Sequence, residues 1–235
     1  VHYTMNINET NIAVFGKGKT GSKVIELIEG NYSFRPIVFD STNLPDKNKL
    51  KNISFIIAFV PSEILNKYID LFLQQGISLV SGATGLCWSN EVKEKIVQNK
   101  LHWITGSNFS LGMRVIYQMI KVLEKAKKIW PSVNLNIHEI HHTKKVDGPS
   151  GTALSWGEWI GIDDKSKITF NREGDVVGDH SLEFETKSEK ITLRHEALDR
   201  TLFAEGAIFA LEYLIQGKLN PGLHYFEDIT KKELN

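Results

Sequence analysis

The sequence predicts an α/β protein in which a doubly wound parallel sheet forms the first domain and a second, α+β domain carries a mixed sheet. In the first half, short apolar stretches alternate with amphipathic helical ones, the order that yields parallel strands joined by crossover helices. Between Lys167 and Glu196, short strand-like segments alternate with glycines and charged turns instead. The change of pattern predicts that residues 1–108, completed by 200–235, form the first domain and 109–199 the second.

The composition favours a small-molecule ligand over nucleic acid or a membrane. Lys+Arg and Asp+Glu both number 28, so no overall field attracts a polyanion or an anionic surface. The longest apolar run, Ile53 to Val60, is far shorter than the ~20 residues that cross a bilayer. No secretory signal is predicted, and the single cysteine, Cys87, excludes an internal disulfide. These features predict a cytoplasmic protein.

Strands and helices alternate in the first domain. Strands are predicted where apolar runs stop at glycine, proline or aspartate, and helices where apolar residues recur every three or four positions. The predicted strands are 11–15, 35–40, 52–60, 77–80 and 101–104, and the predicted helices are 19–30, 63–75 and 89–100.

A glycine motif lies at the first strand-to-helix turn. Gly16, Gly18 and Gly21 have G-x-G-x-x-G spacing, with a strand before them and a helix after. The first glycine permits the tight turn, the second lets a pyrophosphate approach, and the third lets the helix pack on the strand. The helix N-terminus then holds phosphate through its N–H groups and macrodipole. The combination predicts a Rossmann-like dinucleotide-binding domain rather than glycines that merely permit a turn.

Asp40 is predicted to bind the ribose of the dinucleotide. It ends the second strand, 19 residues after Gly21, where a carboxylate accepts hydrogen bonds from ribose hydroxyls. Ser41 follows it, and no arginine stands there to meet a 2′-phosphate, so NADH is slightly favoured over NADPH. NADPH stays open because three lysines that could supply the charge follow closely: Lys47, Lys49 and Lys51.

Other cofactor contacts are expected at the carboxyl ends of the remaining strands, because ligands of parallel α/β sheets bind beyond those ends. The residues found there are Phe59, Gly82, Ala83, Thr84, Gly106, Ser107, Asn108 and Phe109.

The second domain is expected to open with a helix over 111–129 that Pro131 ends. In the strand 133–141, the odd positions form an apolar face that Glu139 and His141 continue. The remaining predicted elements are a helix at 152–160, strands at 167–171, 176–177, 181–186 and 189–196, and an apolar helix at 201–216 that returns to the first domain.

The end of the strand 133–141 and the loop after it are dense in groups that can act as acids, bases or cations: His138, His141, His142, Lys144 and Lys145. No metal site is expected, since the histidines lack H-E-x-x-H spacing and positions 138 and 141 point to opposite faces of a strand. Histidines held merely by hydrogen bonds are an alternative.

The turn from Pro149 to Thr152 indicates what this loop binds. It places small residues, hydroxyls and free N–H groups at a helix N-terminus, which is an anion site. With cations just upstream, the segment suits a substrate that bears carboxylates, with a proton donor beside the reacting carbon. Combined with a nicotinamide, it predicts a reduction that delivers hydride to one carbon and a proton to its neighbour.

The stretch Glu139 to Leu154, EIHHTKKVDGPSGTAL, resembles the substrate-loop motif of the 4-hydroxy-tetrahydrodipicolinate reductases (dihydrodipicolinate reductases) of the diaminopimelate route to lysine. The resemblance covers nearly the whole chain, because GKGKTG (16–21), GATG (82–85), SNFSLG (107–112) and the set Arg172, Gly174, Gly178 and His180 also match. It implies NAD(P)H-dependent reduction of 4-hydroxy-tetrahydrodipicolinate to tetrahydrodipicolinate with loss of water. It further implies a small dicarboxylate substrate and a homotetramer built by the second domain, which closes on the first by a hinge.

The resemblance also implies individual roles. His141 matches the acid/base histidine and Lys145 the proton donor, while His142, Gly151 and Thr152 match contacts to the substrate carboxylates. The implied coenzyme contacts are Asp40, the strand-end residues given above, and the whole glycine turn: Gly16, Lys17, Gly18, Lys19, Thr20 and Gly21.

Three features depart from the family pattern. Ala58-Phe59-Val60 stands where Asp-Phe-Thr is common, Gly148 replaces an alanine, and the first domain is shorter between Asp40 and Pro61. They bear on coenzyme affinity and preference more than on the chemistry.

Two other functions compete with the reductase: a dinucleotide-binding protein without turnover, and a different dehydrogenase on the same scaffold. The intact set of His141, His142 and Lys145 disfavours the first, and the intact turn 149–152 disfavours the second.

Overall fold

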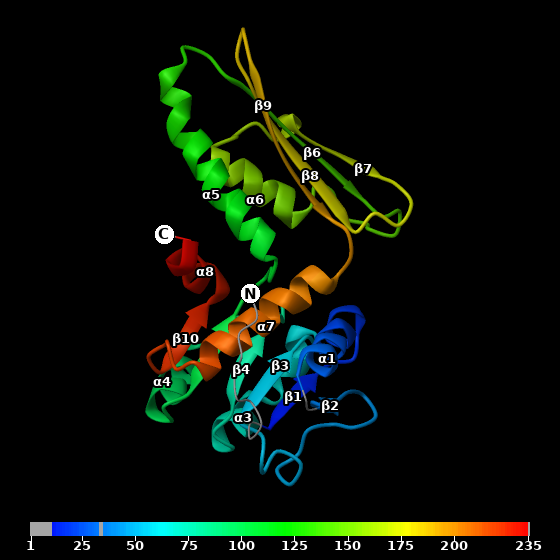
Figure 1. The fold of residues 1–235 in the computed structure, drawn as a ribbon, viewed down its shortest axis with the longest axis vertical. Coiled ribbons are helices and arrows are strands. Elements are labelled where there is room, and N and C mark those ends of the chain that lie inside the picture. Colours follow the sequence, from blue (N-terminus) through cyan, green and yellow to red (C-terminus); the bar gives the residue numbers. More distant parts are fainter. Residues whose placement is uncertain (1–10, 33–34, 235) are drawn as a thin grey trace. The chain divides into compact units, whose positions relative to one another are not determined.

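A computed structural model describes residues 11–32 and 35–234 (Figure 1). The chain divides into two compact units, one made of Val1–Ser110 with Thr201–Asn235 and the other of Leu111–Arg200. The sequence-based boundaries lie within two residues of these positions. Residues 1–10, where a secretory signal was sought, lie outside the described part. Across the described ranges, no helix is both long enough and apolar enough to cross a membrane.

The first unit is built on a six-stranded sheet in which every neighbouring pair runs parallel, in the order β10-β5-β4-β3-β1-β2. The strands are β1 (Ile12–Phe15), β2 (Ile37–Phe39), β3 (Phe55–Ala58), β4 (Ser78–Ser81), β5 (His102–Thr105) and β10 (Gly222–Tyr225). The helices are α1 (Lys19–Asn31), α2 (Ser62–Asn66), α3 (Ile69–Gln74), α4 (Asn90–Gln98), α7 (Thr201–Ile215) and α8 (Phe226–Leu234). The predicted doubly wound parallel sheet is confirmed.

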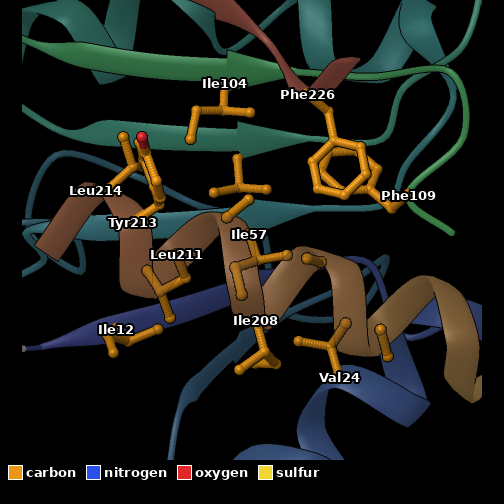
Figure 2. Close-up of a cluster of buried hydrophobic side chains, with 14 of the residues drawn as sticks. Ile12, Val24, Ile57, Ile104, Phe109, Ile208, Leu211, Tyr213, Leu214 and Phe226 are labelled. Atoms are coloured by element: carbon orange, nitrogen blue, oxygen red, sulfur yellow. The ribbon is translucent and has the colours of Figure 1, made fainter. Parts of the chain in front are cut away.

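Each face of this sheet carries its own core. Helices α1, α7 and α8 cover one face, where Val24 and Leu211 pack against strand residues such as Ile12 and Ile57 (Figure 2). Helices α2, α3 and α4 cover the other face, where Phe72 joins a second cluster. Because α7 is apolar nearly all round, it is mostly buried, as such helices are in globular proteins.

Two expectations for this unit are corrected. The single helix 63–75 is two helices, because the chain tightens between them into a turn in which the Tyr68 N–H donates to the Leu65 carbonyl oxygen (2.9 Å). Strand β10 and helix α8 were not predicted. The strand GLHY is short and lacks β-branched residues, and its pairing with β5 is a contact between segments distant in the sequence.

The second unit is a four-stranded sheet in the order β7-β6-β8-β9, with α5 and α6 along one face (Figure 1). Its elements are α5 (Leu111–Ala126), η1 (Lys127–Ile129), β6 (Asn134–His141), α6 (Gly151–Ile160), η2 (Lys165–Lys167), β7 (Ile168–Arg172), β8 (Gly178–Glu185) and β9 (Lys190–Ala197). Strand β6 pairs parallel with β7 and antiparallel with β8, so the predicted mixed sheet is confirmed.

The predicted strand 176–177 is wrong. The Val176 N–H donates to the Glu173 carbonyl oxygen (3.3 Å) in a turn around Gly174, whose φ of 45° lies in the left-handed region. The chain enters β8 only at Gly178.

Candidate functional site

The candidate coenzyme site lies where the strand order of the parallel sheet reverses. The chain runs from β1 to β2 on one side and then crosses to β3 on the other, and Phe15 at the end of β1 is the partner of Ala58 at the end of β3. Ligands of open α/β sheets bind in the crevice at such a point. The residues that follow these two strand ends are Gly16 and Phe59, both predicted cofactor contacts.

The glycine turn is shaped for close backbone approach. Gly16 has a φ of 107°, and a Cβ there would collide with the carbonyl oxygen of Phe59. A Cβ on Gly21 would collide with the carbonyl oxygen of Gly16, so the start of α1 lies directly on the turn. Gly18 is the N-cap of α1 and has no side-chain cap, and no acidic residue lies in the first turn. The first N–H groups of α1 are therefore available to an anion such as a pyrophosphate.

Asp40 follows β2, and its carboxylate accepts hydrogen bonds from the turn that comes directly after it. One carboxylate oxygen, Oδ1, accepts from the Thr42 N–H (2.8 Å), the Thr42 hydroxyl (2.7 Å) and the Asn43 N–H (3.0 Å). These hydrogen bonds, with the charge of Lys17, hold the pKa of Asp40 below its usual range. An ionised carboxylate is thus fixed in orientation beside the glycine turn.

The ring of Phe109 is part of the core rather than of an open site. It is 1% exposed and packs between Phe226 (4.6 Å between ring centres) and Phe59 (5.8 Å). The predicted coenzyme contact of Phe109 could therefore be made only by its backbone. Gly82 makes room for the Phe59 ring, which a Cβ would strike, and Gly106 makes room for the Phe109 and Phe226 side chains. Among the other predicted contacts, Thr84 and Ser107 are exposed, Asn108 is half-buried and Ala83 is buried.

The second unit brings together the predicted proton-transfer and substrate residues. His141 ends β6 on its inward face and is 8% exposed, with its Nδ1 3.4 Å from Glu139 Oε2. Its ring meets that of His180 edge to face, with 5.0 Å between centres. Gly178 leaves space for it, because a Cβ there would lie 3.1 Å from His141 Nε2.

Lys145 lies on a loop that Arg172 holds. The ammonium of Lys145 pairs with both oxygens of Asp147 (2.8 and 2.7 Å), which lowers the pKa of Asp147. The Arg172 guanidinium donates to the Lys145 carbonyl oxygen (3.2 Å) and to that of Asp147. It also stacks on Phe170, 4.7 Å from the ring centre.

The predicted anion turn forms the N-terminus of α6. Ser150 is the N-cap, and its Oγ accepts from the Ala153 N–H (3.2 Å). Gly151 and Thr152 are the first two residues of the helix, so their N–H groups precede the hydrogen-bonded turns. His142 follows β6 and is half-buried.

Burial and charge give two groups of this site unusual protonation. Burial is the largest influence on the pKa of His141 and lowers it to about 4, although the Glu139 carboxylate acts in the opposite sense. For Glu139, burial raises the pKa, but hydrogen bonds from His180 and Ser150 outweigh it and lower the pKa to about 2. At neutral pH His141 is therefore a neutral imidazole beside an ionised carboxylate.

His138 and Lys144 stand apart from this cluster. His138 points to the other face of β6, where its Nδ1 lies 2.8 Å from the Thr169 hydroxyl. Lys144 is exposed. Within the described part of the chain, one set of donors lies close enough to hold a metal ion, with its ligand atoms within 4.8 Å of one another: Glu139, His141 and His180.

Three residues of the site had no predicted role: Glu139, Arg172 and His180. The alternation of β6 placed Glu139 on the apolar face, and an acid at a buried position was the signal that marks it. Its partners could not be predicted, because β7, β8 and α6 bring them from distant parts of the sequence.

The family model described as "Dihydrodipicolinate reductase, C-terminus" matches residues 113–229. Two similar proteins are named 4-hydroxy-tetrahydrodipicolinate reductase. The one from Buchnera aphidicola subsp. Cinara cedri is 34% identical, over 81% of this chain and 76% of its own. The one from Rickettsia bellii is also 34% identical, over 96% of each chain.

Among solved structures, the dipicolinate-bound dihydrodipicolinate reductase from Paenisporosarcina sp. TG-14 has the same fold. It is 21% identical, with a TM-score of 0.71, over 94% of this chain and 99% of its own.

Proposed function

The chain belongs to the 4-hydroxy-tetrahydrodipicolinate reductase (dihydrodipicolinate reductase) family, and from this premise we propose how its two units divide the reaction. The protein is an NAD(P)H-dependent oxidoreductase that reduces 4-hydroxy-tetrahydrodipicolinate to tetrahydrodipicolinate, with loss of water, in lysine biosynthesis. The first unit holds the nicotinamide coenzyme, and the second holds the substrate and delivers the proton.

One observation carries the assignment of the substrate site. His141, the loop of Lys145 and the N–H groups of Gly151 and Thr152 at the start of α6 are gathered around the end of β6. A helix N-terminus beside a lysine ammonium and the neutral imidazole of His141 binds carboxylates and offers a proton donor at the same place.

The residues of this chain then have separate tasks. The N–H groups of Gly151 and Thr152, with His142, bind the substrate carboxylates. Lys145 gives its proton to the carbon beside the one that is reduced, and His141, neutral at physiological pH, accepts and passes on a proton. When bound, the reduced nicotinamide supplies the hydride.

The first unit fits such a coenzyme. The turn at Gly16 and Gly21 has no room for a Cβ, and the start of α1 has neither a side-chain cap nor an acidic residue to compete with a pyrophosphate. Lys17 and Lys19 are exposed around this turn. Side chains and backbone there match the needs of two linked phosphates.

We propose that the coenzyme is NADH in preference to NADPH. The fixed, ionised carboxylate of Asp40 accepts from ribose hydroxyls and repels a 2′-phosphate, and exposed Ser41 offers no positive charge. Values of kcat/KM measured with both coenzymes on 4-hydroxy-tetrahydrodipicolinate test this. A strong preference for NADPH would refute it.

The same assay tests the function itself. Purified protein should oxidise NADH only when 4-hydroxy-tetrahydrodipicolinate is present, and dipicolinate should compete with that substrate. A protein that binds NADH without turnover would instead be the dinucleotide-binding protein considered above.

We also propose a homotetramer assembled through the second unit. Helices α5 and α6 cover one face of its sheet, and we place the contact between subunits on the other face, which carries His138 and Thr169. Sedimentation at micromolar concentration should give four times the 26.6 kDa chain mass. A monomer at the concentration used for assay would refute this state.

A cytoplasmic location is proposed as well. The single cysteine, Cys87, is free and exposed, a state that a reducing compartment preserves. Fractionation of producing cells should place the activity in the cytoplasmic fraction.

A further inference from the structure

The inward face of β6 contains a carboxylate where an apolar residue would be expected. Glu139 is fully buried and continues the row of Leu135 and Ile137. Burying a charge costs several kcal/mol unless partners compensate it, and an ion pair seldom adds stability over an apolar residue of the same size. The position therefore calls for a reason other than stability.

The carboxylate of Glu139 ties the end of β6 to the start of α6. The Ser150 N–H donates to Oε1 (2.8 Å) and the Ser150 hydroxyl donates to Oε2. The same hydroxyl oxygen accepts from the Ala153 N–H and so caps the helix. One side chain of β6 thus sets where the N–H groups of Gly151 and Thr152 lie relative to His141, two residues further along the strand.

The same carboxylate reaches the loop of Lys145 through Arg172. The guanidinium lies 3.5 Å from Glu139 Oε1 and donates to the carbonyl oxygens of Lys145 and Asp147. On the remaining side, His180 Nε2 lies 3.3 Å from Oε2, and His141 Nδ1 lies 3.4 Å from it. Among the described residues, the charged and titratable groups within 4 Å of the Glu139 carboxylate therefore belong to the site or hold a part of it.

We propose that Glu139 is a positioning residue that holds His141, the carboxylate-binding turn and the Lys145 loop in one reactive arrangement. This inference rests on the reductase function proposed above. Glu139 acts through Ser150, Arg172 and the imidazoles and does not touch the substrate. Small displacements of reacting groups are enough to matter, since an error of about 1 Å can cost about a hundredfold in rate.

A metal site is the competing use of the same residues, because zinc binds imidazole and carboxylate ligands. Two observations favour the positioning role. The carboxylate oxygens already accept from Ser150, and the Arg172 guanidinium adds positive charge 3.5 Å away.

The test compares Glu139→Gln with Glu158→Gln. Glu158 lies on α6, the helix whose N-cap Ser150 is held by Glu139, but the side chain of Glu158 is exposed. Glu139→Gln should lower kcat and raise the KM for 4-hydroxy-tetrahydrodipicolinate, for a loss in kcat/KM of about a hundredfold, with an unchanged Kd for NADH. Glu158→Gln should match the parent protein in all three values.

A pH profile separates positioning from mere structural support. The Glu139 charge raises the pKa of His141, whereas burial, Lys145, Arg172 and His180 lower it. Removal of the Glu139 charge should lower the pKa of His141, so the part of the kcat/KM-versus-pH curve that reports His141 should shift to lower pH. Glu139→Asp restores the charge and should shift that part of the curve back. A Glu139→Gln enzyme with the parent's kcat, KM and pH limb overturns the proposal.

Two further measurements cover misfolding of the variant and the alternative of a metal site. If Glu139→Gln does not fold, Ser150→Ala decides: it should raise the substrate KM with the pH limb unmoved, and an unchanged KM overturns the proposal. Chelator-treated parent enzyme should keep full activity, whereas loss of activity that zinc restores would overturn the proposal in favour of a metal site.

Failure of the parent protein to turn over 4-hydroxy-tetrahydrodipicolinate at all would refute the proposed function instead. Dipicolinate binding to the Glu139 variants would then still report whether the carboxylate-binding turn at Gly151 and Thr152 is in place.

Discussion

Lys145 and Lys144 are adjacent in the sequence but have different surroundings in the fold. Lys145 is only partly exposed, pairs with Asp147 and lies on the loop that Arg172 holds, whereas Lys144 is exposed. At the scale of single residues, the fold therefore gives the two lysines different surroundings, and these favour Lys145 as the proposed proton donor.

Replacing Lys145 by alanine should remove most turnover. A positioned proton donor contributes about a hundredfold to ten-thousandfold in rate, so kcat/KM should fall by that factor while the Kd for NADH is unchanged. Steady-state kinetics and coenzyme titration measure both values. Lys144→Ala is the matched control and should behave as the parent protein. Equal kcat/KM in the two variants would contradict the role of Lys145 as donor.

Acid should destabilise the fold through the same site. The folded pKa of Glu139 is about 2 against 4.5 unperturbed, so its contribution is present above pH 4.5 and is lost as the pH falls toward 2. The folded pKa of His141 is about 4 against 6.5, so protons bind the unfolded chain first and stability falls from pH 6.5 toward 4. Both groups therefore lower the free energy of unfolding as the pH falls.

Urea unfolding should therefore give a smaller free energy of unfolding at about pH 5 than at about pH 7. A His141→Asn variant should show a shallower decline over this interval, although half-buried His195, whose pKa is also lowered by burial, keeps part of it. Equal stability of the parent protein at the two pH values would contradict the assignment of a neutral His141.

The positions of the candidate residues on their strand and helix could be predicted from the sequence, but the residues that support them could not. Adjacent residues put His141 at a strand end and Gly151 at a helix start, because strand alternation and N-capping act over a few residues. The partners of Glu139 come from three other elements, so no local pattern shows them. For Phe109, the strand-end position predicted a coenzyme contact but not that its ring would be buried in the core.

At the scale of elements, packing depends on glycines that sequence spacing did not mark. Gly206 lies within α7, and a Cβ there would collide with the carbonyl oxygen of Phe109. Helix α7 therefore lies against the backbone of the loop that follows β5, at a distance that leaves no room for a side chain at Gly206. Gly30 in α1, by contrast, is exposed with open space around it.

These two glycines give opposite predictions for one substitution. Gly206→Ala must move α7 or the Phe109 backbone and should destabilise the protein by about 1–3 kcal/mol or more. Gly30→Ala removes a poor helix former without a clash and should stabilise it by up to about 1 kcal/mol. Thermal and urea unfolding measure both, and a neutral Gly206→Ala would show that the contact can relax.

The alternation of strands and helices could be predicted because strands and helices differ in hydrophobic period. The break between α2 and α3 and the edge strand β10 could not be predicted. At the break between α2 and α3, the Tyr68 ring packs against Phe72 and against Phe15, which is distant in the sequence. Strand β10 exists because β5 offers it an edge, and a four-residue segment with little β preference gives no local sign of that.

For the whole molecule, the two units have separate cores and separate proposed ligands. NADH alone should slow amide exchange in the glycine turn and the first turn of α1, and dipicolinate alone should slow it in the first turn of α6. Hydrogen exchange with each ligand measures this. Protection of the α6 turn by NADH alone would contradict the division of tasks.

The division of the first unit into two segments has a consequence for how the protein is made. Residues 201–234 supply α7, β10 and α8 to a sheet whose other strands precede Ser110, and the whole second unit lies between them in the chain. On the ribosome, Leu111–Arg200 is therefore complete while the older sheet still lacks an edge strand and much of one core. Nascent chains arrested once Arg200 has emerged should resist protease across the later-made middle and be cut in the earlier-made start, so this protein finishes its interior segment first and its beginning last.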